Sequence, residues 1–326
     1  MNNNENQHEE PETPQETKKK LVLLDRMLAD YKLSTEDIPD AVELYYDAQR
    51  LRILHYNKDR TEDDRAQMRR WFNSWLETGE KLLKRKIEDW LGSEEAPLES
   101  KWAYDQDGIG PVLASGLSAY IDVTKAPTVS SLWKFAGLAP GSDRRVKGKK
   151  LPYCARLKVL CFKLGESFVK ISGKEGATYG RLYAEFKQQE VRRNEEGKYA
   201  AVAVDELRSK NFRDDTVTKT RLLSGKLSDA HLHARAKRRV VKIFLQHFWQ
   251  TAREARNLTV NAPYAGQILG HTGIIKAKSS EQPRPQERAI PIEKPKLQER
   301  AITLEKTKKK KRAKKDEKPN IDSSEP

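Results

Sequence analysis

The segment DQDGIGPVLA, from Asp105 to Ala114, decides the fold that this sequence predicts. Gly108 and Gly110 can adopt backbone angles that are closed to other residues, which allows a tight bend and a close approach to another surface. Pro111 suits the first position of a helix, where its missing N–H leaves no hydrogen bond unmade. The segment therefore predicts the turn of a helix-hairpin-helix, with a helix that begins at Pro111.

The opening turn of that helix, which contains Val112, is a candidate phosphate contact. Its first backbone amides point outward along the helix axis and carry partial positive charge. A phosphate bound there positions a protein on DNA without reading the base sequence. The alternative is a plain glycine-rich turn before a buried helix, because a lone GxG pattern has little specificity.

A basic loop lies farther along the chain, around Gly141 and Gly148. A run of charges is most often a solvated surface, but a second phosphate-compatible feature in the same segment favours contact with nucleic acid. We expect the bend and the loop to converge on one exposed surface that grips a sugar-phosphate chain. The basic side chains of the loop are Arg144, Arg145, Lys147, Lys149 and Lys150.

Two further segments complete a family resemblance. LWKFAGLAP, from Leu132 to Pro140, precedes the basic loop, and a helical pattern with Arg156 near its start follows it. Together with GIGP, and in the same order and spacing, these segments resemble the C-terminal domain of the bridge-RNA-guided insertion-sequence transposases, the Piv-like DEDD recombinases. The resemblance covers residues 105–170, roughly a fifth of the chain.

The resemblance implies both a chemistry and a missing part. In that family an N-terminal domain holds four acidic metal ligands on a mixed sheet, and the C-terminal domain supplies a serine that links covalently to DNA. The serine follows GLAP, where this sequence has Ser142, so the resemblance implies Ser142 as the catalytic nucleophile. Residues 21–100 depart from the family, because they predict helices and no apolar strand that ends in an acid. We therefore expect no metal-binding domain and no cofactor.

Composition divides the chain into four parts. Residues 1–20 are polar and predict disorder. Residues 21–100 predict a helical hairpin or coiled arm about 40 Å long, and residues 101–275 predict the transposase-like DNA-binding domain. Residues 276–326 predict a disordered, lysine-rich tail with salt-sensitive affinity for nucleic acid. Because no segment alternates convincingly in the manner of a strand, the expected fold is mostly α.

Inside the third part, residues 194–226 leave two readings open, a helix-rich insertion or a mobile loop. A strong helix is expected after them, from Asp229 as its cap to about Asn257. We expect its basic residues, and Arg156 before them, to contact DNA; the alternative is a solvated basic face beside a core stripe. The basic residues of this helix that we expect to contact DNA are Arg235, Arg238 and Arg239.

Charge and hydropathy narrow the choice of partners. The 326-residue chain has a net charge of +15, which indicates a polyanionic partner. No apolar run approaches the roughly twenty residues that span a bilayer, so we expect a cytoplasmic, nucleoid-associated protein without a membrane partner. The spacing of Cys154 and Cys161 is not that of a metal knuckle, and we expect two reduced thiols.

Three functions follow as alternatives. The first is a DNA-binding protein of a mobile element that acts in transposition or recombination. The second is an active transposase that works with a separate nuclease-domain partner, with or without a guide RNA. The third is a non-catalytic RNA-binding or scaffold protein whose basic tail binds nucleic acid. In each case the helical arm offers a surface for a homo-oligomer.

Overall fold

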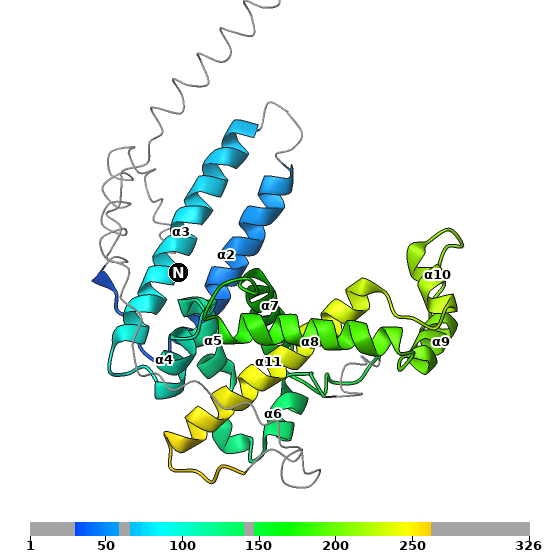
Figure 1. Ribbon diagram of the computed structural model, residues 1–326. Helices are drawn as coiled ribbons and strands as arrows, with labels where there is room; N and C mark the ends of the chain where they lie inside the picture. The colour runs from blue at the N-terminus through cyan, green and yellow to red at the C-terminus, as the bar shows by residue number, and fades with distance from the viewer. Residues whose placement is uncertain (1–29, 59–65, 140–146, 262–326) are drawn as a thin grey trace, which may run out of the picture. The chain divides into compact units, whose positions relative to one another are not determined.

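The computed structural model describes residues 30–58, 66–139 and 147–261, and this part is mostly α-helical, as expected (Figure 1). Within these residues there are ten α-helices, one 3-10 turn and no strand. The predicted disordered start and lysine-rich tail lie outside the described residues. The elements are α2 (Ile38–Lys58), α3 (Ala66–Gly92), α4 (Leu98–Tyr104), α5 (Pro111–Tyr120), η1 (Val123–Lys125), α6 (Val129–Phe135), α7 (Ala155–Lys170), α8 (Thr178–Glu195), α9 (Ala200–Ser209), α10 (Val217–Leu223) and α11 (Asp229–Glu254).

Helices α2 and α3 pack side by side and form an arm (Figure 1). The 27 residues of α3 span about 40 Å at 1.5 Å per residue. At the root of the arm, Val42 and Ile87 are fully buried in the main core. Farther out, Arg52 Nε donates to Glu80 Oε1 at 2.5 Å and joins the two helices. The arm is therefore rooted in the same core as the other helices.

Helix α11 is the element on which much of this core is built. It packs against α4, α6, α7 and α8, and its buried residues recur at the three- and four-residue spacing of an amphipathic helix. Phe244 stacks on Trp102 and lies edge-on to Tyr179. The helix begins at Asp229, as expected, but its N-cap is Ser228 and not Asp229, because the Ser228 side chain accepts from the His231 backbone N–H.

Helices α9 and α10 form a second, smaller hydrophobic cluster that includes Leu232 of α11. The region 194–226 is thus helix-rich, the first of the two readings that its composition left open. Thr216 caps α10 by accepting a hydrogen bond from the Lys219 backbone N–H.

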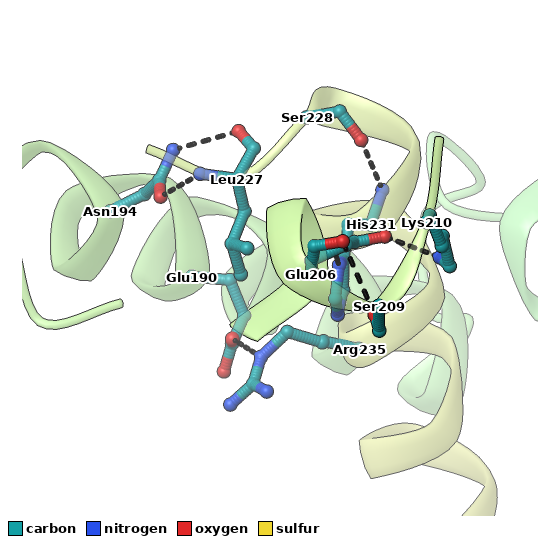
Figure 2. A network of polar contacts seen from close by, with 9 residues as sticks. All are labelled: Glu190, Asn194, Glu206, Ser209, Lys210, Leu227, Ser228, His231 and Arg235. Carbon is teal, nitrogen blue, oxygen red and sulfur yellow. Dashed lines mark hydrogen bonds and ion pairs between the residues drawn. The ribbon is translucent and has the colours of Figure 1, made fainter. Parts of the chain in front are cut away.

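A network of polar contacts ties this smaller cluster to α8 and α11 (Figure 2). The buried carboxylate of Glu190 accepts hydrogen bonds at 2.7 Å from Arg235 Nε and from the Tyr199 hydroxyl. Asn194 pairs in both directions with the backbone of Leu227, donating at 3.2 Å and accepting at 2.8 Å. These bonds satisfy polar groups that burial would otherwise penalise.

Candidate nucleic-acid interface

The two-glycine bend forms as predicted between two helices, α4 and α5, but it is packed against another part of the protein. Gly108 has φ +81°, the left-handed conformation that favours glycine. Its carbonyl accepts a hydrogen bond from the Ser167 hydroxyl, and Asp107 pairs with Lys174 at 2.7 Å. The Val112 side chain is buried in the main core.

The bend and the described part of the basic loop, Lys147 to Lys150, approach opposite ends of α7, so the described residues do not bring them together on one surface as expected. The bend contacts Ser167 and Ile171, at the C-terminal end of α7. The loop leads into the N-terminal end of the same helix, where the Cys154 backbone N–H donates to the Phe135 carbonyl at 2.9 Å. The 16 residues of α7 separate the two by about 24 Å.

Three residues expected in the site, Ser142, Arg144 and Arg145, lie outside the described residues. The nucleophile that the resemblance implies at Ser142 therefore stays a prediction. The rest of the loop is described: Lys147, Lys149 and Lys150 are exposed and flank Gly148, whose φ of +79° is in the left-handed region.

The arginines of α11 divide between the interior and the surface. Arg235 is paired with Glu190 and its guanidinium lies over the Tyr199 ring, 4.4 Å from the centroid. Arg239 lies over the Phe186 ring at 3.9 Å, and burial, together with the charge of Arg193, lowers its pKa. Only Arg238 of the three is exposed. The expectation that Arg235 and Arg239 face outward is corrected, because both side chains pack against α8 or its neighbours.

A different set of cations gathers where α6, the start of α7 and the middle of α11 pack together. Trp133 of α6 donates from Nε1 to the Lys242 carbonyl at 3.0 Å, and the Lys242 ammonium lies 4.1 Å from the centre of the same ring. Lys158 lies over the Tyr153 ring at 4.2 Å, beside Gly137. We use the name cationic face for Lys134, Lys158, Arg238 and Lys242 on these helices together with Lys147, Lys149 and Lys150 on the exposed loop that leads into α7.

None of these seven side chains forms an ion pair within the described residues. From Pro127 to Lys163 the sequence has nine Lys and Arg residues and one acid, Asp143. From Ala230 to Arg253, which covers most of α11, it has no acid at all. Burial and the charge of Arg238 lower the pKa of Lys242. An anion on this face would therefore relieve a concentration of uncompensated positive charge.

Neighbouring cations that do have acidic partners mark the edge of this face. Arg156 pairs with Glu43 of the arm at 2.6 Å, although its side chain is well exposed. Lys237 pairs with Glu166, and its ammonium lies 4.9 Å from the centre of the Phe162 ring. Arg156 was expected to contact DNA, and it lies beside the face with its charge already compensated.

The sequence prediction left out Lys134, a single lysine among apolar residues that does not stand out as part of a charge run. Lys158 and Lys242 lie on the basic sides of helices that the sequence places toward a polyanion, but neither was among the contact residues expected. The signal that could have found all three is the near-absence of acids over the same residues, because a solvated surface usually mixes both signs.

Other chemistry is not assembled in the described part. Burial raises the pKa of the Cys161 thiol to about 12, and neither this cysteine nor Cys154 is in a disulfide. His231 contacts Glu206, and His233 contacts the Tyr183 hydroxyl at 2.6 Å. Across the described ranges, no three His, Cys, Asp or Glu side chains group in a way that could hold a metal ion.

Comparison with protein-family models, with curated proteins and with solved structures finds no match to this chain. The resemblance to the transposase domain therefore rests on the quoted segments alone. None of the described helices combines the length and apolarity that crossing a bilayer requires.

Proposed function

We propose that this chain binds DNA through the cationic face, and that it does so in the transposition or recombination of a mobile element. The observation that carries the binding is a group of seven cations that form no ion pair within the described residues, on α6, α7, α11 and the loop that leads into α7. The positive charges of lysine and arginine are attracted to DNA phosphates whatever the base sequence, so the binding is expected to be largely independent of sequence.

The rigidity of the face supports this proposal. Lys158 and Lys242 are each held over an aromatic ring, and Trp133 is fixed by its hydrogen bond to α11. Cations placed in this way lose less conformational freedom on binding than lysines on an unstructured tail. The link to transposition comes from the resemblance of residues 105–170 to the transposase domain. The DNA-binding proposal does not depend on this link.

The alternative is that the lysine-rich tail alone binds nucleic acid. Fluorescence anisotropy of a DNA duplex of arbitrary sequence, titrated with the full chain and with a chain that ends at Ile275, separates the two. The proposal predicts that the shortened chain still binds, with a salt dependence of its own. Complete loss of binding on removal of the tail would favour the alternative.

Strand transfer by Ser142 is the further enzymatic part of the proposal. It predicts a covalent protein–DNA adduct, resistant to denaturant, that a Ser142→Ala variant does not form. Absence of an adduct with duplex, single-stranded and RNA-guided substrates would leave a protein that binds DNA without cutting it.

A further inference from the structure

The arm carries large apolar side chains that stay exposed among the residues the structure describes. On α3, Trp71 is 66% exposed, Trp75 is 62% exposed and Met68 is 73% exposed. On α2, Leu44, Leu51 and Leu54 are all at least 40% exposed. We call these six residues the apolar arm face. Tryptophan is rarely left so open unless a partner or ligand covers it.

The six side chains lie on one side of the arm. With 3.6 residues per turn, Leu44 and Leu51 differ by about 20° around α2, and Met68, Trp71 and Trp75 fall within about 60° around α3. Ring contacts join the two stripes across the helix pair. Phe72 lies edge-on to His55 of α2, with centroids 5.3 Å apart, and stacks on Trp75 at 5.8 Å. His55 is one turn beyond Leu51, so the stripes are continuous.

The area of this face is that of a stable interface. From their exposed fractions, the six side chains present on the order of 600–700 Å² of surface per chain, against about 800 Å² per partner in a standard interface. A contiguous apolar patch on a monomer seldom exceeds about 600 Å².

The charges of the arm favour a second copy of the chain as the occupant. Residues 30–58 and 66–92 contain ten acidic and ten basic residues, whereas the whole chain has a net charge of +15. The arm is therefore neither repelled by its own copy nor attractive to a polyanion. In α2 the acid Asp40 lies toward the root and the base Lys58 lies at the tip, while Asp47 and Arg50 between them pair with each other at 3.8 Å. An antiparallel second copy places unlike charges opposite each other.

Gly79 supplies an independent observation. It lies in the middle of α3, one turn beyond Trp75 and on the same side, where glycine weakens a helix. A Cβ atom added there would have no neighbour within 4 Å, so no described part of the chain requires a glycine at this position. A close approach by a helix of another molecule is a reason to have one.

From these observations we infer that two copies of this chain pack through the apolar arm face, antiparallel and related by a two-fold axis. Such an interface is self-complementary, since the same residues contribute from both sides. The dimer carries two cationic faces, but its formation does not depend on DNA.

The test is sedimentation equilibrium of the full chain at roughly 1–100 µM, in high salt and after nuclease treatment so that nucleic acid cannot bridge the copies. The wild-type chain is expected to dimerise. Trp71→Gln and Gly79→Gln are each expected to weaken the dimer at least about tenfold. Ile53→Gln is the matched control: it removes an exposed apolar side chain of α2 on the opposite side from Leu51, and the dimer should be unchanged within about twofold.

Circular dichroism of the variants separates loss of the dimer from loss of the fold. Gly79→Gln is especially informative, because glutamine is a better helix former than glycine and the site is open in the single chain. A wild-type chain that stays monomeric up to about 100 µM overturns the inference. So does a dimer that Trp71→Gln and Gly79→Gln leave intact.

Discussion

The Gly108 carbonyl accepts a hydrogen bond from the Ser167 hydroxyl, which fixes the two-glycine bend to the C-terminal end of α7. This contact explains why the bend needs a glycine: φ is +81°, and a Cβ on Gly108 would lie 2.8 Å from Ile171 Cδ1. The bend is therefore a structural joint between α5 and α7, about one helix length from the cationic face.

Substitutions at the two glycines of the bend should have different effects. Gly108→Ala is expected to lower the free energy of unfolding by about 1–3 kcal/mol, because it adds strain and a steric clash. Gly110→Ala should be nearly neutral, since φ is −89° and the space around its Cβ is empty. Urea unfolding measures both. A loss of DNA affinity in Gly110→Ala at unchanged stability would restore the bend as a phosphate site.

The pair Arg235 and Arg238 separates stability from binding. Arg235→Gln leaves the buried carboxylate of Glu190 without its main partner and is expected to cost about 2–3 kcal/mol of stability. Arg238→Gln removes an exposed charge, so stability should change by less than about 0.5 kcal/mol while DNA affinity falls. Thermal unfolding and anisotropy on the same samples check this. The opposite result, in which Arg238→Gln lowers stability and Arg235→Gln lowers only DNA affinity, would contradict the placement of DNA on the Arg238 side of α11.

Lowering the pH should weaken the packing of α9 and α10 against α8 and α11. Burial alone would raise the pKa of Glu190, but hydrogen bonds from Arg235 and Tyr199, with the charges of Arg235 and Arg193, lower it overall. A carboxyl whose folded pKa is depressed contributes stability above its unfolded pKa and loses it as pH falls through the folded value. Unfolding free energy should therefore decline below about pH 4–5.

The control for this pH dependence is Glu190→Gln, which should be less stable at pH 7 and should show a shallower decline toward low pH. An equal decline in the variant and the wild type would assign the acid sensitivity to other carboxyls, such as Glu206, whose pKa is also lowered.

The two thiols should react at different rates. Cys161 is buried and its pKa is raised to about 12, so almost no thiolate forms at neutral pH. Cys154 is half-buried at the start of α7. A thiol reagent is expected to modify one cysteine per folded chain and two per unfolded chain, and a Cys154→Ser variant should be unreactive until it unfolds. Rapid labelling of both cysteines in the folded protein would contradict the packing of α7.

The helices were predictable because their apolar residues recur at the spacing of one helix face. This holds for α7 and α11. The left-handed backbone conformation at Gly108 was also predictable, because glycine adopts it readily. The burial of α5 could be predicted as well. The residues from Pro111 to Tyr120 are small or apolar on nearly every side of the helix, which is typical of a helix inside a core.

The errors concern which partner a side chain meets. Arg235 falls on a basic stretch of α11, and only the fold reveals that α8 brings the Glu190 carboxylate to it. The sequence also does not show which residues of α3 face α2: Leu76 and Glu80 are buried, whereas Trp71 and Trp75, at the same apolar spacing, are exposed. Periodicity identifies an apolar side of a helix, but it does not say which molecule packs against it.

The most direct test of the cationic face is the salt dependence of DNA binding in two charge-matched variants. One replaces Lys147, Lys149 and Lys150 with Gln, and the other replaces Lys81, Lys84 and Arg85 on the exposed surface of α3. If each lysine of the loop contacts a phosphate, the slope of log K against log salt should fall by about 2–3 in the first variant and stay unchanged in the second. Equal slopes and affinities in the two variants would contradict the account.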